Sequence, residues 1–244
     1  MAGNWKMYKT PAETNAFLEK FLPLVTQSSH CEILICPPLV NIATAVAAAQ
    51  ATQVGIGAQN LHWAAEGAFT GEVSAPMLKA AGCRSVIIGH SERRQYFAET
   101  DETVRKRTLA ALDAGLQPVV CVGERLEDRE SGNTDTVLET QFRDGIASLT
   151  PAQFAQIVIA YEPVWAIGTG KVATPEQADD AHHFLRELVR TTFGPEAAAN
   201  IRILYGGSVK PDNIKGLMAK VNIDGALVGG ASLDPVSFAS IVNF

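Results

Sequence analysis

The chain of 244 residues has few cysteines, no excess of positive charge and no long apolar run, and each shortage excludes a class of protein. The four cysteines, Cys31, Cys36, Cys83 and Cys121, form no Cys-x-x-Cys pair. We therefore expect reduced thiols in a cytoplasmic protein rather than a disulfide scaffold. Every apolar run is shorter than the roughly 18 residues of a membrane span, so no membrane partner is expected.

The charge balance and the first residues exclude two further classes. A net charge of −6 argues against nucleic acid as a partner. It leaves room for a small anionic ligand, because backbone N–H groups can bind anions locally. The start, Met1 to Lys6, lacks the basic and apolar stretches of a secretory signal.

Short β-rich runs alternate with helical segments along the whole chain. They are apolar almost without alternation, as strands buried on both faces should be. The runs are 33–36, 54–58, 85–89, 118–122, 157–161, 201–205 and 225–228, with a weaker eighth candidate at 2–5. Eight strand–helix units of roughly 30 residues each predict an α/β fold, a closed (β/α)8 TIM barrel.

The alternative is a doubly wound open sheet, whose dinucleotide-binding signature is missing. Gly55 and Gly57 are followed by no third glycine at the required spacing. No linker or change in composition interrupts the chain, so we expect a single catalytic domain over 1–244. Helices are expected after Thr10-Pro11, Thr150-Pro151 and Thr174-Pro175, which resemble N-caps followed by Pro, and two short ones after Lys210-Pro211 and Asp234-Pro235.

In such a barrel the active site lies where the strands end. The strand ends carry Asn4 and Lys6, His90, Glu162, Gly206-Gly207-Ser208 and Gly229-Gly230. Taken singly, each has an ordinary explanation: a surface Glu, a structural His, a solvated Lys and two tight turns. Together they place one base, one imidazole, one cation and two glycine-rich turns on one rim.

The chemistry of these residues fits proton transfer on a phosphorylated ligand. Glu162 precedes Pro163 and a glycine-rich segment that is typical of a lid, as a base shielded from water requires. If a helix begins at Ser91, the N–H groups of Ser91 and Glu92 point toward His90 and favour a neutral ring. The glycines would let backbone N–H groups approach phosphate closely.

Three other features do not predict a site. Gly168 to Lys171 fails the nucleotide-loop pattern, because Trp165 stands where its first glycine is required. His182 and His183 point in diverging directions on a helix, so a metal pair is not expected. Cys121 has no base beside it in the sequence and is interpreted as a packing residue.

Four segments give the chain a family resemblance. They are Asn4-Trp5-Lys6-Met7, Gly89 to Arg94, Tyr161 to Lys171 and Tyr205 to Val209. In this order they resemble the signatures of the triosephosphate isomerase family, and the resemblance covers essentially the whole chain. It implies interconversion of dihydroxyacetone phosphate and D-glyceraldehyde 3-phosphate through a cis-enediolate, in glycolysis and gluconeogenesis, with no metal or organic cofactor.

The resemblance also implies a role for each matching residue. Glu162 would move the proton between the two substrate carbons, and a neutral His90 would donate a hydrogen bond to the carbonyl oxygens, a pairing established for this family. Lys6 would stabilise the negative intermediate and Asn4 would orient the substrate. The expected phosphate ligands are the backbone N–H groups of Gly168, Ser208, Gly229 and Gly230. Ser91, Glu92 and Tyr205 would support this cluster, and residues 163–173 would form the lid.

The resemblance further implies a homodimer. The segment Gln59 to Ala75 would enter a pocket on the partner, with Thr70 near the other subunit's Asn-Lys pair. Two departures from the family concern the start of the chain and Tyr8, which replaces a polar residue near the interface. Only Met1 precedes Ala2, so either the first strand is short, or the chain was trimmed or its start misassigned. A different sugar-phosphate barrel enzyme and a non-catalytic binding protein remain the alternatives.

Overall fold

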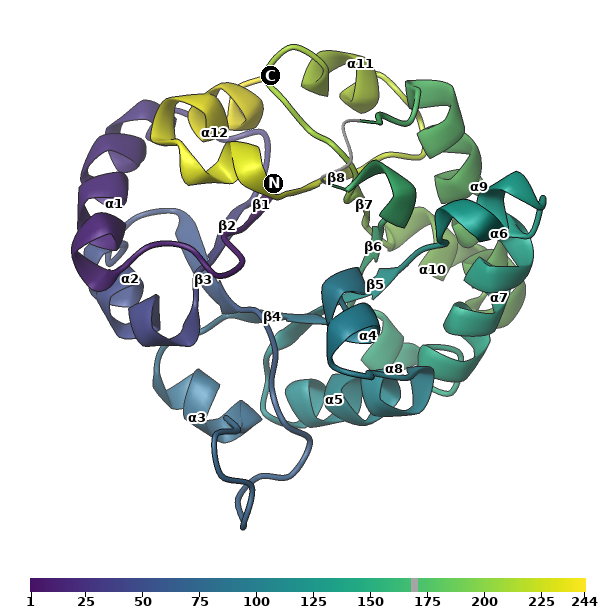
Figure 1. The fold of residues 1–244 in the computed structure, drawn as a ribbon, viewed down its shortest axis with the longest axis horizontal. Coiled ribbons are helices and arrows are strands. Elements are labelled where there is room, and N and C mark those ends of the chain that lie inside the picture. Colours follow the sequence, from purple (N-terminus) through teal and green to yellow (C-terminus); the bar gives the residue numbers. More distant parts are fainter. Residues whose placement is uncertain (168–170) are drawn as a thin grey trace.

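The computed structural model describes residues 1–167 and 171–244, and its centre is a closed barrel of eight parallel strands (Figure 1). Each strand pairs with its neighbours in the sequence, and the last pairs with the first. The strands are β1 (Ala2–Asn4), β2 (Ile33–Cys36), β3 (Val54–Ala58), β4 (Ser85–Ile88), β5 (Gln117–Val122), β6 (Val158–Tyr161), β7 (Ile203–Tyr205) and β8 (Gly225–Val228). The expected (β/α)8 barrel is confirmed.

The first strand is short, as expected, and still closes the barrel. β1 has three residues, and Ala2 is paired with both Leu34 of β2 and Leu227 of β8. The expected runs at 33–36, 54–58 and 225–228 match the strands, and the others differ by one or two residues at their ends.

Helices surround the barrel (Figure 1). They are α1 (Pro11–Val25), α2 (Ile42–Ala48), α3 (Ala75–Ala80), α4 (Ser91–Tyr96), α5 (Asp101–Asp113), α6 (Leu126–Glu130), α7 (Thr134–Gly145), α8 (Pro151–Phe154), α9 (Pro175–Phe193), α10 (Pro195–Asn200), α11 (Ile214–Met218) and α12 (Pro235–Val242). Three 3-10 turns are η1 (Leu39–Asn41), η2 (Val164–Ala166) and η3 (Gly230–Leu233). In the described part of the chain, no helix is both long and apolar enough to cross a bilayer.

Apolar side chains on both faces of the strands explain their uninterrupted hydrophobic runs. One buried cluster includes Ala2, Ile87, Val119 and Leu204, and a larger one joins the strands to the helices. A strand that is buried on both sides needs apolar residues at consecutive positions. This packing fixes the strand ends on which the candidate site depends.

Local capping sets most helix starts as expected. Thr10, Thr150 and Thr174 each form a capping box with the residue three positions later. The helix expected at Lys210-Pro211 is an error: residues 211–213 form a turn and α11 begins at Ile214. Asn213 explains the turn, because its side chain accepts from Lys210 N at 2.8 Å and donates to Ser208 O at 2.9 Å.

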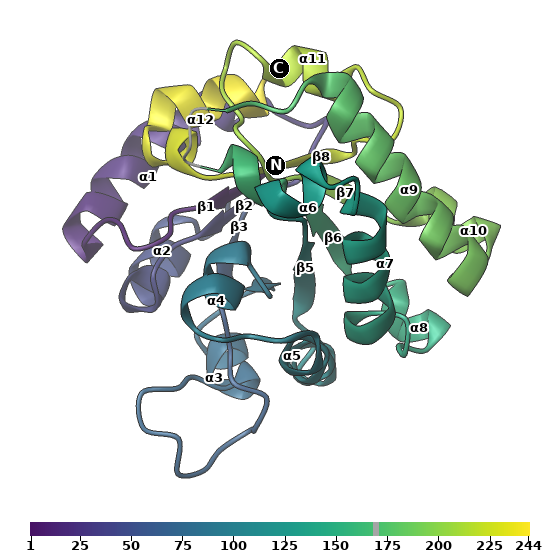
Figure 2. The same ribbon diagram turned by 45° about the vertical axis from the view of Figure 1, so that its right-hand side comes forward.

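The long segment between β3 and α3 extends away from the barrel, as both views show (Figures 1 and 2). Its own contacts hold it in shape. His62 N donates to Val73 O at 2.7 Å, and the His62 ring lies against Trp63 and Phe69 with centroid distances of 4.2 and 4.1 Å. An ordered projection of this kind is available for contact with another molecule.

His182 on α9 makes the stability of the fold depend on pH. The side chain is buried, and its Nδ1 lies 3.2 Å from Asn222 O, so the neutral ring carries its proton on Nδ1. Burial lowers the pKa of His182 from 6.5 to about 4. Below pH 6.5 the unfolded chain therefore binds a proton that the folded chain does not, and the folded state loses stability as the pH falls.

We predict that His182→Gln, which can keep a hydrogen bond to Asn222 O but does not titrate, flattens this dependence. From pH 7 to pH 4 the free energy of unfolding of the parent protein should fall by about 3 kcal/mol more than that of the variant. Urea unfolding at matched protein concentrations measures both. Equal falls in the two proteins would show that His182 is not the group responsible.

Candidate active site

A cavity of about 760 Å³ opens at the carboxyl ends of the strands and collects the expected side chains. Its lining includes Asn4, Lys6, His90, Glu162, Gly206, Gly207, Ser208, Gly229 and Gly230. These residues come from five different strand ends, so the barrel rather than local sequence brings them together. Gly168 lies outside the described residues, as does part of the expected lid.

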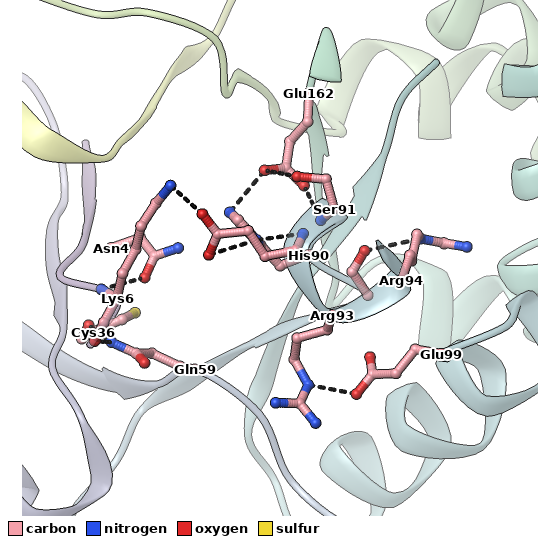
Figure 3. A network of polar contacts seen from close by, with 12 residues as sticks. Asn4, Lys6, Cys36, Gln59, His90, Ser91, Arg93, Arg94, Glu99 and Glu162 are labelled. Atoms are coloured by element: carbon pink, nitrogen blue, oxygen red, sulfur yellow. Dashed lines mark hydrogen bonds and ion pairs between the residues drawn. The ribbon is translucent and has the colours of Figure 1, made fainter. Parts of the chain in front are cut away.

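Glu162 is a buried carboxylate directly after β6. Its side chain is 2% exposed. Oε2 accepts a hydrogen bond from Ser91 N at 3.0 Å, and Oε1 lies 2.9 Å from Nε2 of His90 (Figure 3). Burial alone would raise the pKa of Glu162, but His90 and hydrogen bonds from Ser91 and Cys121 outweigh burial and hold the pKa below its ordinary value. The carboxylate is therefore ionised and able to accept a proton.

His90 lies two residues after β4 and caps α4. Its Nδ1 accepts a hydrogen bond from Glu92 N at 3.2 Å, so that nitrogen carries no proton and Nε2–H is the donor to Glu162. Only one of the two expected N–H groups reaches the ring, because Ser91 N donates to Glu162 instead. Burial lowers the pKa of His90, whereas the charge of Glu162 and its hydrogen bond raise it, and the net direction is upward.

Two neighbours affect the charge of His90 in opposite directions. Glu92 N–H donates to Nδ1, so a proton on Nδ1 would face another donor, and this contact disfavours the imidazolium. The Glu162 carboxylate favours the imidazolium through its negative charge. A ligand that drew Glu162 away from Nε2 would thus leave a neutral ring with a free Nε2–H donor.

Lys6 adopts a left-handed backbone, with φ of 50°, that two side chains hold in place. Asn4 Oδ1 accepts from Lys6 N at 3.0 Å, and Gln59 Nε2 donates to Lys6 O at 2.8 Å and to Cys36 O at 2.9 Å (Figure 3). The Lys6 ammonium pairs with Glu92 Oε1 at 2.5 Å. Its positive charge therefore lies at the pocket beside the His90–Glu162 pair.

The two glycine-rich turns differ in what they require. A Cβ on Gly206 would lie 2.9 Å from Glu162 Cγ, and one on Gly207 would lie 2.2 Å from the Tyr205 hydroxyl, so packing excludes side chains there. A Cβ on Gly229 would lie 3.6 Å from Lys6 Cε, and one on Gly230 would meet nothing within 4 Å. The second turn therefore presents bare backbone to open space beside a cation.

A second buried carboxylate, Glu124, contacts the first residues of the expected lid, Val164 and Trp165. Its Oε1 accepts from Tyr161 Oη at 3.1 Å and from Trp165 Nε1 at 2.8 Å, and it pairs with Arg129 at 3.2 Å. Tyr205 ends the neighbouring β7, and burial raises its pKa to about 12, so its hydroxyl stays protonated. Glu124 thereby joins the end of β6 to the 3-10 turn η2 that follows it.

Sequence analysis missed Cys121, Glu124 and Gln59 as parts of the site. Cys121 is buried as expected, yet its thiol hydrogen-bonds to Glu162. Glu124 follows β5 and could have been found by applying the strand-end rule to that strand. Gln59 follows β3, and the sequence contains no signal that its amide would reach two carbonyls on other strands.

The pocket thus combines an ionised base, an imidazole that donates a hydrogen bond and an ammonium group. Such a set can remove a proton next to a carbonyl and stabilise the negative oxygen that results. Among residues 1–167 and 171–244, no three His, Cys, Asp or Glu side chains are grouped so as to hold a metal ion.

Comparisons with known proteins agree with one another. The family model for triosephosphate isomerase matches residues 1–244. A triosephosphate isomerase from Solibacter usitatus is 71% identical over 244 residues, covering 100% of this chain and 98% of that protein. One from Citrifermentans bemidjiense is 56% identical, covering 100% and 97%. The crystal structure of triosephosphate isomerase from Bartonella henselae has a TM-score of 0.90 and 40% identity, covering 100% of this chain and 97% of that one.

We predict that Glu162→Gln lowers the pKa of His90. The variant keeps the shape of the side chain and removes the charge that raises the imidazole pKa, so burial dominates. NMR of labelled imidazoles, with His90 assigned through a His90→Gln variant, should show the ring neutral to a lower pH than in the parent protein. An unchanged or higher pKa would contradict the arrangement described above.

Proposed function

The chain belongs to the triosephosphate isomerase family and interconverts dihydroxyacetone phosphate and D-glyceraldehyde 3-phosphate, a reaction of glycolysis, and we propose that Glu162, His90, Lys6 and Asn4 carry it out. The observation that carries this assignment is the buried, ionised Glu162 in contact with His90 Nε2, in the same cavity as Lys6. All four side chains belong to one pocket of one chain.

Glu162 is the proton carrier in this proposal. Its carboxylate takes a proton from one substrate carbon, and the resulting acid returns a proton to the neighbouring carbon. In the unliganded arrangement Oε1 and Oε2 are occupied by His90 and Ser91. Binding of the substrate replaces these partners and draws the carboxylate toward the reacting carbons.

The other three side chains stabilise the cis-enediolate. His90 donates from Nε2 to the substrate oxygens while its Nδ1 stays bound to Glu92 N. The Lys6 ammonium lies opposite the developing negative charge, and Glu92 holds it there through their ion pair. Asn4 positions the Lys6 backbone through its Oδ1. Its side-chain amide nitrogen donates a hydrogen bond to a substrate oxygen in this proposal.

The glycine-rich turns bind the phosphate group. Ser208, Gly229 and Gly230 line the cavity, and the open backbone at Gly230 begins η3, whose N–H groups favour an anion. Gly168 would add a fourth N–H from the lid. The lid spans 163–173 in this proposal, and Tyr205 and Ser208 hold it closed over the substrate.

The proposal extends to the domain organisation of the chain and to its location in the cell. We propose that 1–244 forms one catalytic domain, since a single closed barrel supplies every proposed group. All four cysteines are free thiols, which supports the proposed cytoplasmic location because thiols stay reduced there.

Shortening the base tests the central role. Glu162→Asp retracts the carboxylate by one methylene, and a misplacement near 1 Å costs on the order of 100-fold in rate. We expect kcat to fall by that factor with little change in KM, in a coupled assay with glyceraldehyde 3-phosphate. Glu19→Asp, the same change at an exposed position of α1, is the control. A Glu162→Asp rate within a factor of about two of the parent would exclude the role, because such a displacement must be costly.

We propose that the active unit is a homodimer joined through the segment 59–75. Large apolar side chains are exposed on this segment and near the strand ends. They include Trp63 at 38%, Phe69 at 46%, Tyr8 at 57%, Phe97 at 63% and Tyr96 at 68%. Exposed apolar groups mark an interaction surface where they gather into one patch, and we propose that these side chains do so at the dimer interface. Tyr8, two residues after Lys6, links this surface to the active site.

A charge at the tip of the segment tests the dimer. Thr70 is exposed, and Thr70→Arg would bury an unpaired guanidinium at the proposed interface. We expect monomers and a lower kcat, measured by sedimentation equilibrium together with the assay. Thr192→Arg, the same change at an exposed position of α9, is the control. A parent protein that is monomeric and fully active at micromolar concentration would refute the dimer.

A further inference from the structure

Arg94 on α4 carries a largely buried charge outside the substrate pocket. It lines a second cavity of about 450 Å³, the rear cavity, whose walls come from α4, α5, α6 and α7. Figure 3 shows Arg94 on the side of Ser91 away from Asn4 and Lys6. Its side chain is only 16% exposed. A charge that is removed from water to this extent needs partners, and the partners of Arg94 indicate what it does.

Three hydrogen bonds hold the guanidinium group. Nε donates to Gly89 O at 2.9 Å, Nη2 donates to Cys121 O at 3.3 Å, and Nη1 donates to Asp101 Oδ1 at 2.6 Å. Gly89 follows β4, whereas Cys121 belongs to β5. A guanidinium group presents its N–H groups in a fixed planar fork, so one side chain can set the spacing of two acceptors. Arg94 therefore cross-links the chain after β4 to the end of β5.

The cross-link begins where the pairing of β4 with β5 ends. Ile88 and Val120 are the last paired residues of the two strands. The next residue, Gly89, has a φ of 70° and turns the chain out of the sheet toward α4. A Cβ on Gly89 would lie 2.6 Å from Val104 Cγ2 and 3.3 Å from Arg94 Nη2, so the turn is tightly packed. Arg94 thus continues, by side-chain hydrogen bonds, a connection that the backbone no longer makes.

The two carbonyl groups adjoin the proposed reacting side chains. Gly89 directly precedes His90 in the chain. Cys121 directly precedes Val122, whose carbonyl accepts a hydrogen bond from Glu162 N at 2.8 Å. A short path of covalent and hydrogen bonds therefore joins the backbone of His90 to that of Glu162 through the guanidinium group.

We propose that Arg94 is a positioning residue for the reaction, which sets the distance between His90 and Glu162 by holding the carbonyls of Gly89 and Cys121. This inference rests on the proposed roles of His90 and Glu162. It does not require the direct hydrogen bond between the two side chains, which the substrate replaces. Arg94 acts on the backbone from which each side chain extends, so the cross-link serves before and after the substrate binds.

Truncation of Arg94 tests its effect on the rate. For Arg94→Ala we expect kcat to fall by about 10- to 100-fold, because a misplacement near 1 Å can cost 100-fold. KM should change little, since the proposed phosphate ligands follow β7 and β8 rather than β4 and β5. Arg94→Lys keeps the charge, but one ammonium group cannot span both carbonyls, so it should show a smaller fall. The coupled assay measures both.

Arg202→Ala is the matched control for the truncation. Arg202 is exposed and directly precedes β7, at the opposite end of the strands from the substrate pocket. It also takes part in an ion pair, with Glu32 at 2.9 Å. This variant should keep the kcat of the parent protein.

The pKa of His90 reports the position of Glu162 independently of activity. The charge of Glu162 and its hydrogen bond raise that pKa, so a Glu162 that lies farther from Nε2 lowers it. Arg94→Lys is the variant for this measurement, because it retains the positive charge of residue 94. NMR of labelled imidazoles in the unliganded protein should show a lower pKa of His90 in Arg94→Lys than in the parent. Glu92 and Lys6, the other charged groups that affect the ring, are unchanged.

The rear cavity gives access for a chemical rescue. Gln95 and Arg125, which line it, are exposed, so the cavity reaches the surface. Guanidinium ion, at concentrations far below those that unfold proteins, can enter the space that Arg94→Ala leaves and donate to the same two carbonyls. We expect it to raise the kcat of Arg94→Ala several-fold and to leave the kcat of Arg202→Ala unchanged.

The results separate positioning from a purely structural role. A lower kcat with little change in KM in both Arg94 variants, together with a lower pKa of His90 in Arg94→Lys, supports the proposal. An unchanged kcat in both folded variants overturns it. A lower kcat with an unchanged pKa of His90 also overturns it, because the two side chains would then be no farther apart.

Two further provisions keep the test decisive. If Arg94→Ala does not fold, Arg94→Lys and Asp101→Asn carry the test, since Asp101→Asn leaves Arg94 in place and removes the charge that orients it. Full activity in Glu162→Asp would remove the proposed role of Glu162. The pKa of His90 in Arg94→Lys would still show whether Arg94 sets the distance between the two side chains, so the two failures are distinguishable.

Discussion

The site depends on a charge that is kept ionised inside the protein. A buried carboxylate normally takes up a proton, because burial penalises its charged form. Glu162 escapes this through hydrogen bonds from Ser91 N and His90 Nε2, which lie just after β4 at the start of α4. β4 and β6 both pair with β5, so the sheet itself sets the distance between the donors and the carboxylate. The closed barrel is thus the condition for keeping this buried base ionised.

The neighbouring groups extend the same principle. Glu124 is also buried, and its Oε1 contacts Tyr161, Trp165 and Arg129. Lys6 is held at a left-handed backbone angle by Asn4 and Gln59. Side chains that would be unfavourable alone are each stabilised by contacts from another strand. Such strained or charged positions persist only where the surrounding structure determines them, and they commonly lie at active sites.

Much of the fold could be predicted from the sequence, since apolar runs and Thr-Pro caps are local signals. The strand ends also identified Asn4, Lys6, His90 and Glu162, because parallel strands of a barrel end on one rim. What the sequence did not contain was the pairing across strands. The donation from Ser91 N to Glu162 rather than to His90, and the reach of Gln59 to Lys6 O, follow from side-chain positions in the closed barrel. The α11 start was missed because Asn213 closes a turn that Pro211 alone does not reveal.

The ionisation of Glu162 in the unliganded protein is the most direct test of this account. Carbon-13 NMR of labelled glutamate carboxyls, with Glu162 assigned through the Glu162→Gln variant, follows its titration between pH 3 and pH 8. We predict a midpoint below the ordinary value of 4.5, because the hydrogen bonds and His90 outweigh burial. A midpoint above 4.5 would show that burial dominates, and the carboxylate would then lack the support on which the rest of the site depends.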